Sequence, residues 1–196
     1  MKKIISSFAG VAIAVASLIA ADAPSARKAP ELAFSVPGQG QQLLSQYRGK
    51  VVALEFIFTT CPHCQAASKV MTKLQQEYGS RGLQVIDVAV NDNADLLVEN
   101  FAKDFQVNFP VGWTPKDQMI SFMGFSSGRF VVPQLVLIDR KGDIRYQTPA
   151  LEDPSWDSLM KEDAIRQHIE ELLSQGTSAS RRNSGASRVA MTKKPS

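Results

Sequence analysis

The two cysteines of this 196-residue chain lie in one short motif, Cys61-Pro62-His63-Cys64. The apolar run 51–58 precedes the motif, and apolar residues at three- and four-residue spacing follow it as far as Tyr78. These patterns predict a buried strand that leads into the motif and a helix that begins at Pro62. A helix start offers Cys61 unpaired backbone N–H groups and the positive end of the helix dipole, and both favour a thiolate. The motif therefore predicts a redox-active dithiol at a strand–helix junction.

A structural disulfide and a metal site are the alternative interpretations of the two cysteines. A disulfide that stabilises a fold usually closes a long loop, whereas this one would enclose only Pro62 and His63. Structural zinc usually has four ligands, and beyond the cysteines the chain offers only His63 and the distant His168. We therefore expect a redox-active disulfide between Cys61 and Cys64, no metal and no cofactor.

The N-terminus has the layout of a secretory signal peptide. Lys2 and Lys3 precede a weakly apolar stretch that ends at Ala21, and small residues continue to Ala23. A stretch of about 18 to 20 apolar residues can also span a membrane, so a retained anchor is the alternative. We expect residues 1–23 to be cleaved and the protein to be periplasmic or otherwise exported, in a compartment where disulfides form and persist.

The C-terminal segment 176–196 differs in composition from the rest of the chain. It is rich in Ser, Ala, Gly and Thr, has no aromatic residue, and carries five basic residues and no acidic one. Such a segment buries too little apolar surface to offset chain entropy, so we expect a disordered basic tail. Most such tails are simply solvated, and loose attachment to an anionic lipid surface is the functional alternative.

The charge of the central part argues against nucleic acid as a partner. The chain has 22 Lys and Arg against 19 Asp and Glu, and the two ends, 1–23 and 176–196, hold seven of the basic residues and one of the acidic residues. The segment between them is slightly acidic, with 15 basic and 18 acidic residues. A surface that binds nucleic-acid phosphates usually has an excess of basic residues.

The hydrophobic pattern predicts one α/β domain over residues 29–175. In chain order we expect a strand at 33–35, a strand at 51–58, a helix at 62–78, a strand at 83–90, a helix at 94–105, a hairpin of strands at 135–139 and 143–147, and a helix at 162–174. Between the second helix and the hairpin the pattern indicates loops. Continuous apolar runs are typical of parallel strands covered on both faces, so this order predicts a central mixed β-sheet flanked by helices.

Over about residues 29–173 the chain resembles the thioredoxin superfamily, and most of all its exported, redoxin-type thiol–disulfide oxidoreductases of the TlpA/ResA kind. The similarity rests on the segment 47–52, on the Cys-Pro-His-Cys motif, on Val132-Pro133 and on the segment 137–142. The resemblance implies a thioredoxin-like fold with a redoxin-type insert, an extra strand and helix, between the active-site helix and a cis-proline.

Two features depart from that pattern. These relatives usually carry Trp just before the first cysteine, where this chain has Thr59-Thr60. The dipeptide Pro62-His63, with Glu55 six positions before Cys61, is similar to the DsbA-type oxidants. The scaffold therefore suggests a reductant and the dipeptide an oxidant, and the direction of electron flow stays open.

The motif assigns different roles to its two cysteines. Cys61, at the helix start, is expected to attack the substrate, and Cys64, one turn further, to resolve the mixed disulfide. His63 can place a positive charge or an N–H group beside the Cys61 sulfur, and the alternative is an exposed histidine without effect. His168, on the last predicted helix, is expected to be structural or exposed.

Glu55 interrupts the apolar strand before the motif, where an unpaired carboxylate is expensive to bury. By resemblance it occupies the place of thioredoxin's buried acid, which exchanges a proton with the second cysteine. The alternative is a carboxylate that reaches Lys50 or solvent. The resemblance also implies that Pro133 forms a cis peptide facing the dithiol, and that Val132, Pro133 and Pro62 contact the substrate.

The sequence thus predicts an exported thiol–disulfide oxidoreductase that acts on protein cysteines. The resemblance implies cysteine-containing exported proteins as substrates, apocytochromes among the candidates, and an upstream redox partner that can be membrane-bound. A peroxidase of the peroxiredoxin type is one alternative, although such enzymes place Thr three residues before the reactive cysteine and this chain has Phe58. A copper chaperone that uses Cys61, Cys64 and either His63 or His168 is the other.

Overall fold

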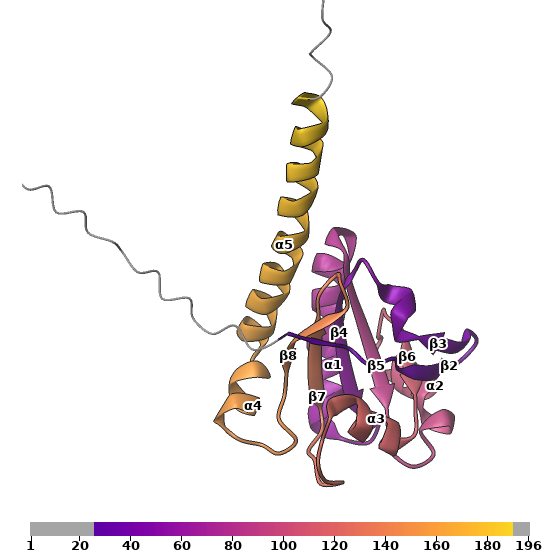
Figure 1. Cartoon of the computed structure of the whole chain (residues 1–196). Coiled ribbons are helices and arrows are strands. Elements are labelled where there is room, and N and C mark those ends of the chain that lie inside the picture. Colours follow the sequence, from indigo (N-terminus) through magenta and orange to yellow (C-terminus); the bar gives the residue numbers. More distant parts are fainter. Residues whose placement is uncertain (1–25, 190–196) are drawn as a thin grey trace, which may run out of the picture.

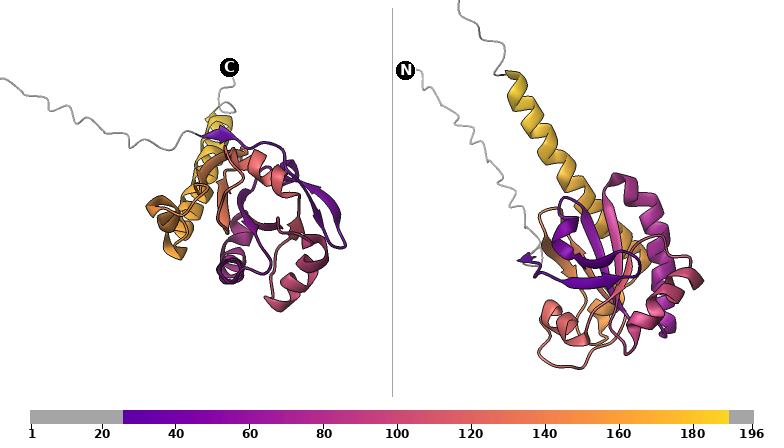
Figure 2. Two further views of the ribbon diagram at one scale, coloured as in Figure 1. Left: turned by 90° about the horizontal axis from the view of Figure 1, so that it is seen from below. Right: turned by 90° about the vertical axis from the view of Figure 1, so that its right-hand side faces the viewer.

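The computed structural model of the chain describes residues 26–189, with side-chain surroundings through Gln175. Eight strands form one mixed sheet in the order β1-β8-β7-β4-β5-β6-β2-β3, and helices flank it (Figures 1 and 2). The predicted α/β class with a thioredoxin-like fold is confirmed. Within the described residues no helix combines the length and the apolar character that crossing a membrane requires. The predicted signal peptide at 1–23 lies outside these residues.

The helices and strands alternate along most of the chain. Their bounds are β1 (Arg27–Lys28), β2 (Ala33–Val36), β3 (Gly40–Leu43), η1 (Leu44–Tyr47), β4 (Val51–Ile57), α1 (Pro62–Tyr78), η2 (Gly79–Arg81), β5 (Leu83–Ala89), α2 (Ala94–Asp104), β6 (Val111–Trp113), α3 (Lys116–Met123), β7 (Gln134–Ile138), β8 (Asp143–Gln147), α4 (Pro154–Leu159) and α5 (Glu162–Val189).

Strands β4 and β5 form the centre of the sheet and run parallel to each other. All seven residues of β4 are buried, as the continuous apolar run predicted. β7 pairs with the other edge of β4 in antiparallel register and continues into the hairpin with β8. Gly142 in the hairpin turn has a φ of 82°, a conformation that glycine adopts without steric cost. This arrangement holds the C-terminal end of β4, and the motif that follows it, in the middle of the sheet.

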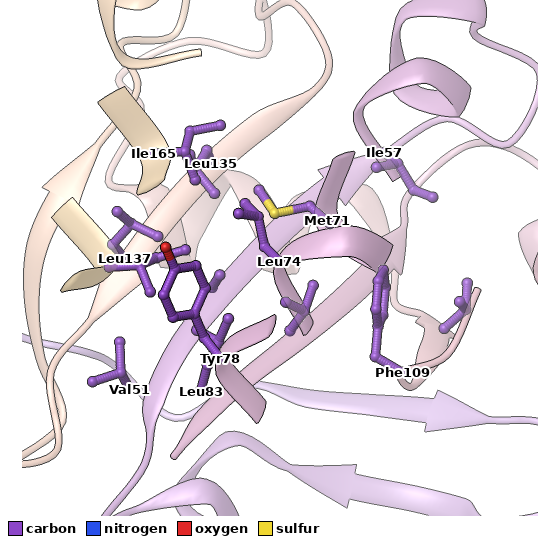
Figure 3. Close-up of a cluster of buried hydrophobic side chains, with 14 of the residues drawn as sticks. Val51, Ile57, Met71, Leu74, Tyr78, Leu83, Phe109, Leu135, Leu137 and Ile165 are labelled. Atoms are coloured by element: carbon purple, nitrogen blue, oxygen red, sulfur yellow. The ribbon is translucent and has the colours of Figure 1, made fainter. Parts of the chain in front are cut away.

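Helix α1 has the bounds predicted from its apolar stripe. Pro62 occupies its first turn, where the missing N–H costs nothing. The stripe Met71, Leu74 and Tyr78 is fully buried, and Figure 3 shows these side chains packed against those of the sheet and of α5. Burial of each such side chain contributes about 1.5 to 3 kcal/mol. α1, α2 and α5 therefore cover one face of the sheet, the face that carries the odd-numbered residues of β4 and β5.

The segment between α2 and Pro133 is more regular than the hydrophobic pattern indicated. It holds the strand β6 and the helix α3, where the pattern indicated loops. α3 begins after Pro115 and ends at Gly124, which has a φ of 70°. Its residues Met119, Phe122 and Met123 pack with β2 and with the even-numbered residues of β4 on the second face.

The C-terminal helix α5 extends beyond the predicted end at Ser174 and reaches Val189. Its first part packs on the sheet through Ile165, Ile169 and Leu172, and its last part projects away from the body of the protein (Figure 1). Once a helix has formed, each added residue gains a backbone hydrogen bond, so the chain continues as a helix past its packed region. The predicted disordered basic tail at 176–196 therefore overlaps this helix as far as Val189, and residues 190–196 lie outside the described residues.

Candidate functional site

Cys61 lies at the junction between the loop after β4 and the first turn of α1. It is the N-cap residue of α1, with extended backbone angles, and its carbonyl oxygen accepts a 3.0 Å hydrogen bond from the Gln65 amide. Its amide donates to the Phe58 carbonyl oxygen at 3.0 Å. Cys61 is partly exposed and Cys64 fully buried, and both are free thiols. Cys61 is thus the more accessible of the two thiols.

The loop that carries Cys61 is held by side chains that the sequence did not single out. The Thr59 amide donates to Asn91 Oδ1 at 2.9 Å, and Gln65 Nε2 donates to the Thr59 carbonyl oxygen at 3.1 Å. Asn91 follows β5, so it reaches Thr59 because β4 and β5 are parallel neighbours whose C-terminal ends meet. Thr59-Thr60, the departure from the family pattern, therefore belongs to a hydrogen-bonded loop.

Val132 and Pro133 face the dithiol, as the resemblance implied. The peptide bond between them is cis, and the Val132 carbonyl oxygen lies 4.0 Å from Cys61 Sγ. The buried Gln134 supports this loop, because its Nε2 donates to the Val131 carbonyl oxygen at 2.9 Å and its Oε1 accepts from Thr148 Oγ1 at 2.6 Å. Gln134 and Thr148 were not among the predicted site residues.

Cys64 lies on the inner side of α1, within the core between the helix and the sheet. Burial raises the pKa of its thiol, and the neighbouring Cys61 and the charge of Glu55 raise it further. A hydrogen bond from the Phe58 backbone acts in the opposite direction. Cys64 therefore needs a group that removes its proton before its sulfur can act as a nucleophile.

Glu55 is fully buried on β4, so the alternative in which it reaches Lys50 or solvent is wrong. Lys50 Nζ instead donates to Gln84 Oε1 at 3.0 Å. The register of β4 and β5 places Glu55 beside a second buried acid, Asp87. Burial raises the pKa of Glu55 well above its usual range, and the charge of Asp87 adds to this effect. The structure thus places a carboxyl group near Cys64, as predicted, and adds one that was not.

An open groove of about 350 Å³ lies beside the motif, between α1 and α4. His63 and Pro133 line one part of it, and Trp156 and Met160 line the opposite part. Pro62 and His63 are exposed at the start of α1. The indole N–H of Trp156 is buried and has no acceptor within the described part of the chain. The groove beside the motif therefore has largely apolar walls.

His168 lies away from this site, on α5. Its ring stacks on Tyr146, with ring centroids 3.8 Å apart, and its Nδ1 lies 4.0 Å from a carboxylate oxygen of Glu171. This position confirms a structural histidine. Between residues 26 and 175 no three His, Cys, Asp or Glu side chains converge in a way that could hold a metal ion.

Known proteins resemble this chain in sequence. Residues 26–147 match the AhpC/TSA family. A relative called thiol-disulfide oxidoreductase ResA, from Geobacillus thermodenitrificans, is 30% identical over 144 residues, which cover 74% of this chain and 75% of the relative. The protein of the same name from Geobacillus kaustophilus is 29% identical over 144 residues, with the same coverage.

Solved structures resemble the chain in fold. A putative thiol:disulfide interchange protein DsbE from Chlorobium tepidum superimposes with a TM-score of 0.61 at 28% identity, over 76% of this chain and 96% of that protein. A putative protein disulfide isomerase from Bacteroides thetaiotaomicron gives a TM-score of 0.60 at 26% identity, over 78% and 91% of the two chains. With the strand–helix dithiol described above, these similarities show that the chain belongs to the AhpC/TSA family and is a thiol–disulfide oxidoreductase of the TlpA/ResA type.

Proposed function

We propose that the protein exchanges disulfides with the cysteines of exported proteins through Cys61 and Cys64. The observation that carries this proposal is the contrast between the two thiols. Cys61 is partly exposed beside a groove and 4.0 Å from the Val132 carbonyl oxygen, whereas Cys64 is enclosed one turn behind it. Such a pair allows one sulfur to meet a substrate while the other waits for the mixed disulfide.

In the reducing direction the reaction has two displacements. The Cys61 thiolate attacks one sulfur of a substrate disulfide, which forms a mixed disulfide and releases the other substrate sulfur as a thiolate. Cys64 then loses its proton and attacks the Cys61 sulfur, which forms the Cys61–Cys64 disulfide and releases the second substrate thiolate. Two electrons pass from the protein to the substrate. The same steps in reverse oxidise a substrate dithiol.

The groove between α1 and α4 is proposed to hold the substrate segment that carries the target cysteine. Pro62, His63, Val132 and Pro133 surround the place where that cysteine would meet Cys61. Trp156, Met160 and Val70 would contact apolar side chains of the bound segment. The groove then favours extended protein segments over small disulfides.

The cellular setting is part of the proposal. Residues 1–23 would export the protein, and cysteine-containing exported proteins, including apocytochromes, would be its substrates. An upstream redox partner, membrane-bound or not, would restore the starting state of Cys61 and Cys64. Fractionation of cells that express the full chain tests the location, since export predicts a shortened protein in the periplasmic or secreted fraction and a cytosolic full-length protein contradicts it.

Three parallel reactions of the reduced protein distinguish this function from its alternatives. A disulfide-bonded protein, hydrogen peroxide and a copper(I) complex are each mixed with the reduced chain, and thiol loss and metal transfer are measured. Disulfide exchange predicts fast thiol loss with the protein disulfide. Faster oxidation by peroxide would favour the peroxidase, and tight copper(I) binding without exchange would favour the copper chaperone.

A further inference from the structure

Asp87 is a second buried acid in the core behind the dithiol. The parallel register of β4 and β5 pairs Glu55 with Asp87, and both side chains are 0% exposed. Their neighbours in the outer strands are apolar, Leu135 of β7 beside Glu55 and Val111 of β6 beside Asp87. Cys64 of α1 is close enough to the pair for the charge of Glu55 to act on its thiol, and Cys61 also acts on that thiol. Two acids thus share one enclosed site without a basic partner across either strand.

The polar contacts of the pair leave room for one proton. Ser68, on the buried face of α1, donates its hydroxyl to Asp87 Oδ2 at 2.6 Å. Both oxygens of Glu55 and Oδ1 of Asp87 are buried and lack a donor among the described residues. Two adjacent carboxylates cannot both stay ionised in such a site without a large penalty. A proton on one of the two acids supplies one donor, which an oxygen of the other acid can accept.

The surroundings of the two acids shift their pKa values for different reasons. Burial raises the pKa of Asp87 to about 7, although the hydrogen bond from Ser68 lowers it. The pKa of Glu55 is raised well above its usual range by burial and by the charge of Asp87. Of the two acids, Glu55 therefore holds the shared proton more tightly, and a negative charge on Asp87 is the one that Ser68 stabilises.

We propose that Glu55 and Asp87 act as one unit, in which Asp87 is the site that takes up a proton when Cys64 is deprotonated. The proposal rests on the disulfide exchange proposed above and deepens it. The Cys64 thiol gives its proton to Glu55, and Glu55 passes the proton that it already holds to Asp87. The Cys64 thiolate then attacks the Cys61 sulfur, and the acid pair is left with two protons and no charge. In the reverse direction the pair returns one proton to the Cys64 sulfur. Asp87 is thus a positioning residue that acts through Glu55.

The first test uses Ser68→Ala, which removes the hydroxyl that stabilises the Asp87 charge. The rate of the resolving step is measured against pH by rapid mixing of the reduced protein with a substrate disulfide. The proposal predicts that the midpoint of this profile moves to higher pH by about one unit or more. Thr72→Ala is the matched control, because the Thr72 hydroxyl on the same helix donates to the Ser68 carbonyl oxygen at 2.9 Å and not to Asp87. A Ser68→Ala profile that coincides with the profiles of Thr72→Ala and the original chain would overturn the proposal.

The second test follows the proton itself. Infrared spectra detect the carbonyl band of a protonated carboxylic acid, and Glu55→Gln identifies the band that belongs to the pair. In Asp87→Asn the band should disappear at a pH lower by about one unit or more, because the charge that holds the proton on Glu55 is gone. A band that titrates as in the original chain would refute the shared proton. If the original chain exchanges no disulfides at all, the proposed function fails, while this measurement still decides whether the pair holds a proton.

Discussion

Cys61 and Cys64 are three residues apart in the chain and lie in different surroundings. Cys61 is partly exposed, next to a groove and to the backbone carbonyl of Val132. Cys64 is fully buried, in a core that also encloses the acids Glu55 and Asp87. One turn of helix thus separates the region that is proposed to meet the substrate from the region that is proposed to exchange the proton. The difference shows how one fold gives two chemically identical side chains unequal tasks.

Single substitutions of the two cysteines test the assigned difference between them most directly. Cys61→Ser should abolish disulfide exchange, because the accessible one of the two thiols is lost. Cys64→Ser should leave capture intact and accumulate stable mixed disulfides between Cys61 and the substrate, which non-reducing gels and mass spectrometry detect. Brief alkylation of the reduced protein at neutral pH should label Cys61 before Cys64. Labelling in the opposite order would show that the assignment of roles is reversed.

The next largest effect is expected from a change of the buried acid Glu55. Glu55→Gln should slow the resolving step by about 100-fold or more, the usual contribution of a positioned general base, and should leave substrate capture by Cys61 nearly unchanged. Rapid-mixing measurements from about pH 5 to about pH 9 separate the two steps and give the pH profile of each.

Asp139→Asn is the matched control for Glu55→Gln. Asp139 is a partly buried acid in the β7–β8 hairpin, where its Oδ1 accepts from the amides of Lys141 and Asp143. The change from acid to amide is the same, and we expect it to leave the resolving step unaffected. Equal resolving rates in Glu55→Gln and the original chain across the whole pH range would reduce Glu55 to a structural residue.

The helices and strands that hold the two cysteines could be predicted where the sequence pattern of each element is local. α1 combines a proline in its first turn with an apolar stripe, and β4 and β5 are continuous apolar runs, so their bounds agree with the predictions to within one residue. β6 and α3 have weaker signals, because β6 has three residues and α3 has eight. Gly112 in β6 is required by the neighbouring strand β2, because a Cβ at this position would lie 2.6 Å from the Ser35 carbonyl oxygen.

In the candidate site, too, residues whose role depends on distant partners could not be predicted from a local pattern. Asp87 carries the same local signal as Glu55, an acid inside an apolar strand, yet only Glu55 was singled out. The partnership of the two depends on the β4–β5 register and on the reach of Ser68 from α1, and neither is encoded in a local pattern. Gln134 and Thr148, which support the Val132–Pro133 loop, were missed because their partners lie 14 residues apart in the chain.

The buried acids also predict an unusual dependence of stability on pH. The pKa of Asp87 rises from its ordinary 3.8 to about 7 in the folded protein, so the folded state binds this proton more tightly than the unfolded state. The free energy of unfolding should therefore be highest below the lower value and should fall as pH rises through the window, by up to about 1.4 kcal/mol per pH unit for one proton. Denaturant titrations of the reduced protein at several pH values measure this slope.

Asp87→Asn isolates the contribution of the acid pair to that slope. The variant cannot gain or lose the proton at residue 87, so its stability should depend less on pH than that of the original chain between about pH 4 and about pH 7. Glu31, Glu77 and Asp153 have lowered pKa values, which favour stability at higher pH and act in both proteins alike. Parallel slopes for the two proteins would mean that Asp87 binds its proton no more tightly when folded.

The smallest effect is expected at the exposed region, where we expect the dipeptide between the cysteines to set the redox potential. His63 is exposed in the first turn of α1, where it can place a positive charge or an N–H group beside a Cys61 thiolate. Stabilisation of the thiolate favours the reduced form, so we expect a potential on the oxidising side of thioredoxin's value of about −270 mV. His63→Pro should move the potential to more negative values by about 30 mV, which corresponds to about 1.4 kcal/mol for two electrons. The helix should tolerate this change, because proline is accepted in a first turn.

Equilibration of the protein with glutathione buffers measures the potential of the Cys61–Cys64 pair in each variant. Lys73→Gln is the control, since it removes an exposed positive charge from the same helix at a position three turns from the cysteines and should leave the potential unchanged. The buried acids are the same in all three proteins, so any difference between His63→Pro and the control belongs to the exposed region. A potential at or below that of thioredoxin, unaltered by His63→Pro, would assign the direction of electron flow to the scaffold and the buried acids rather than to the dipeptide.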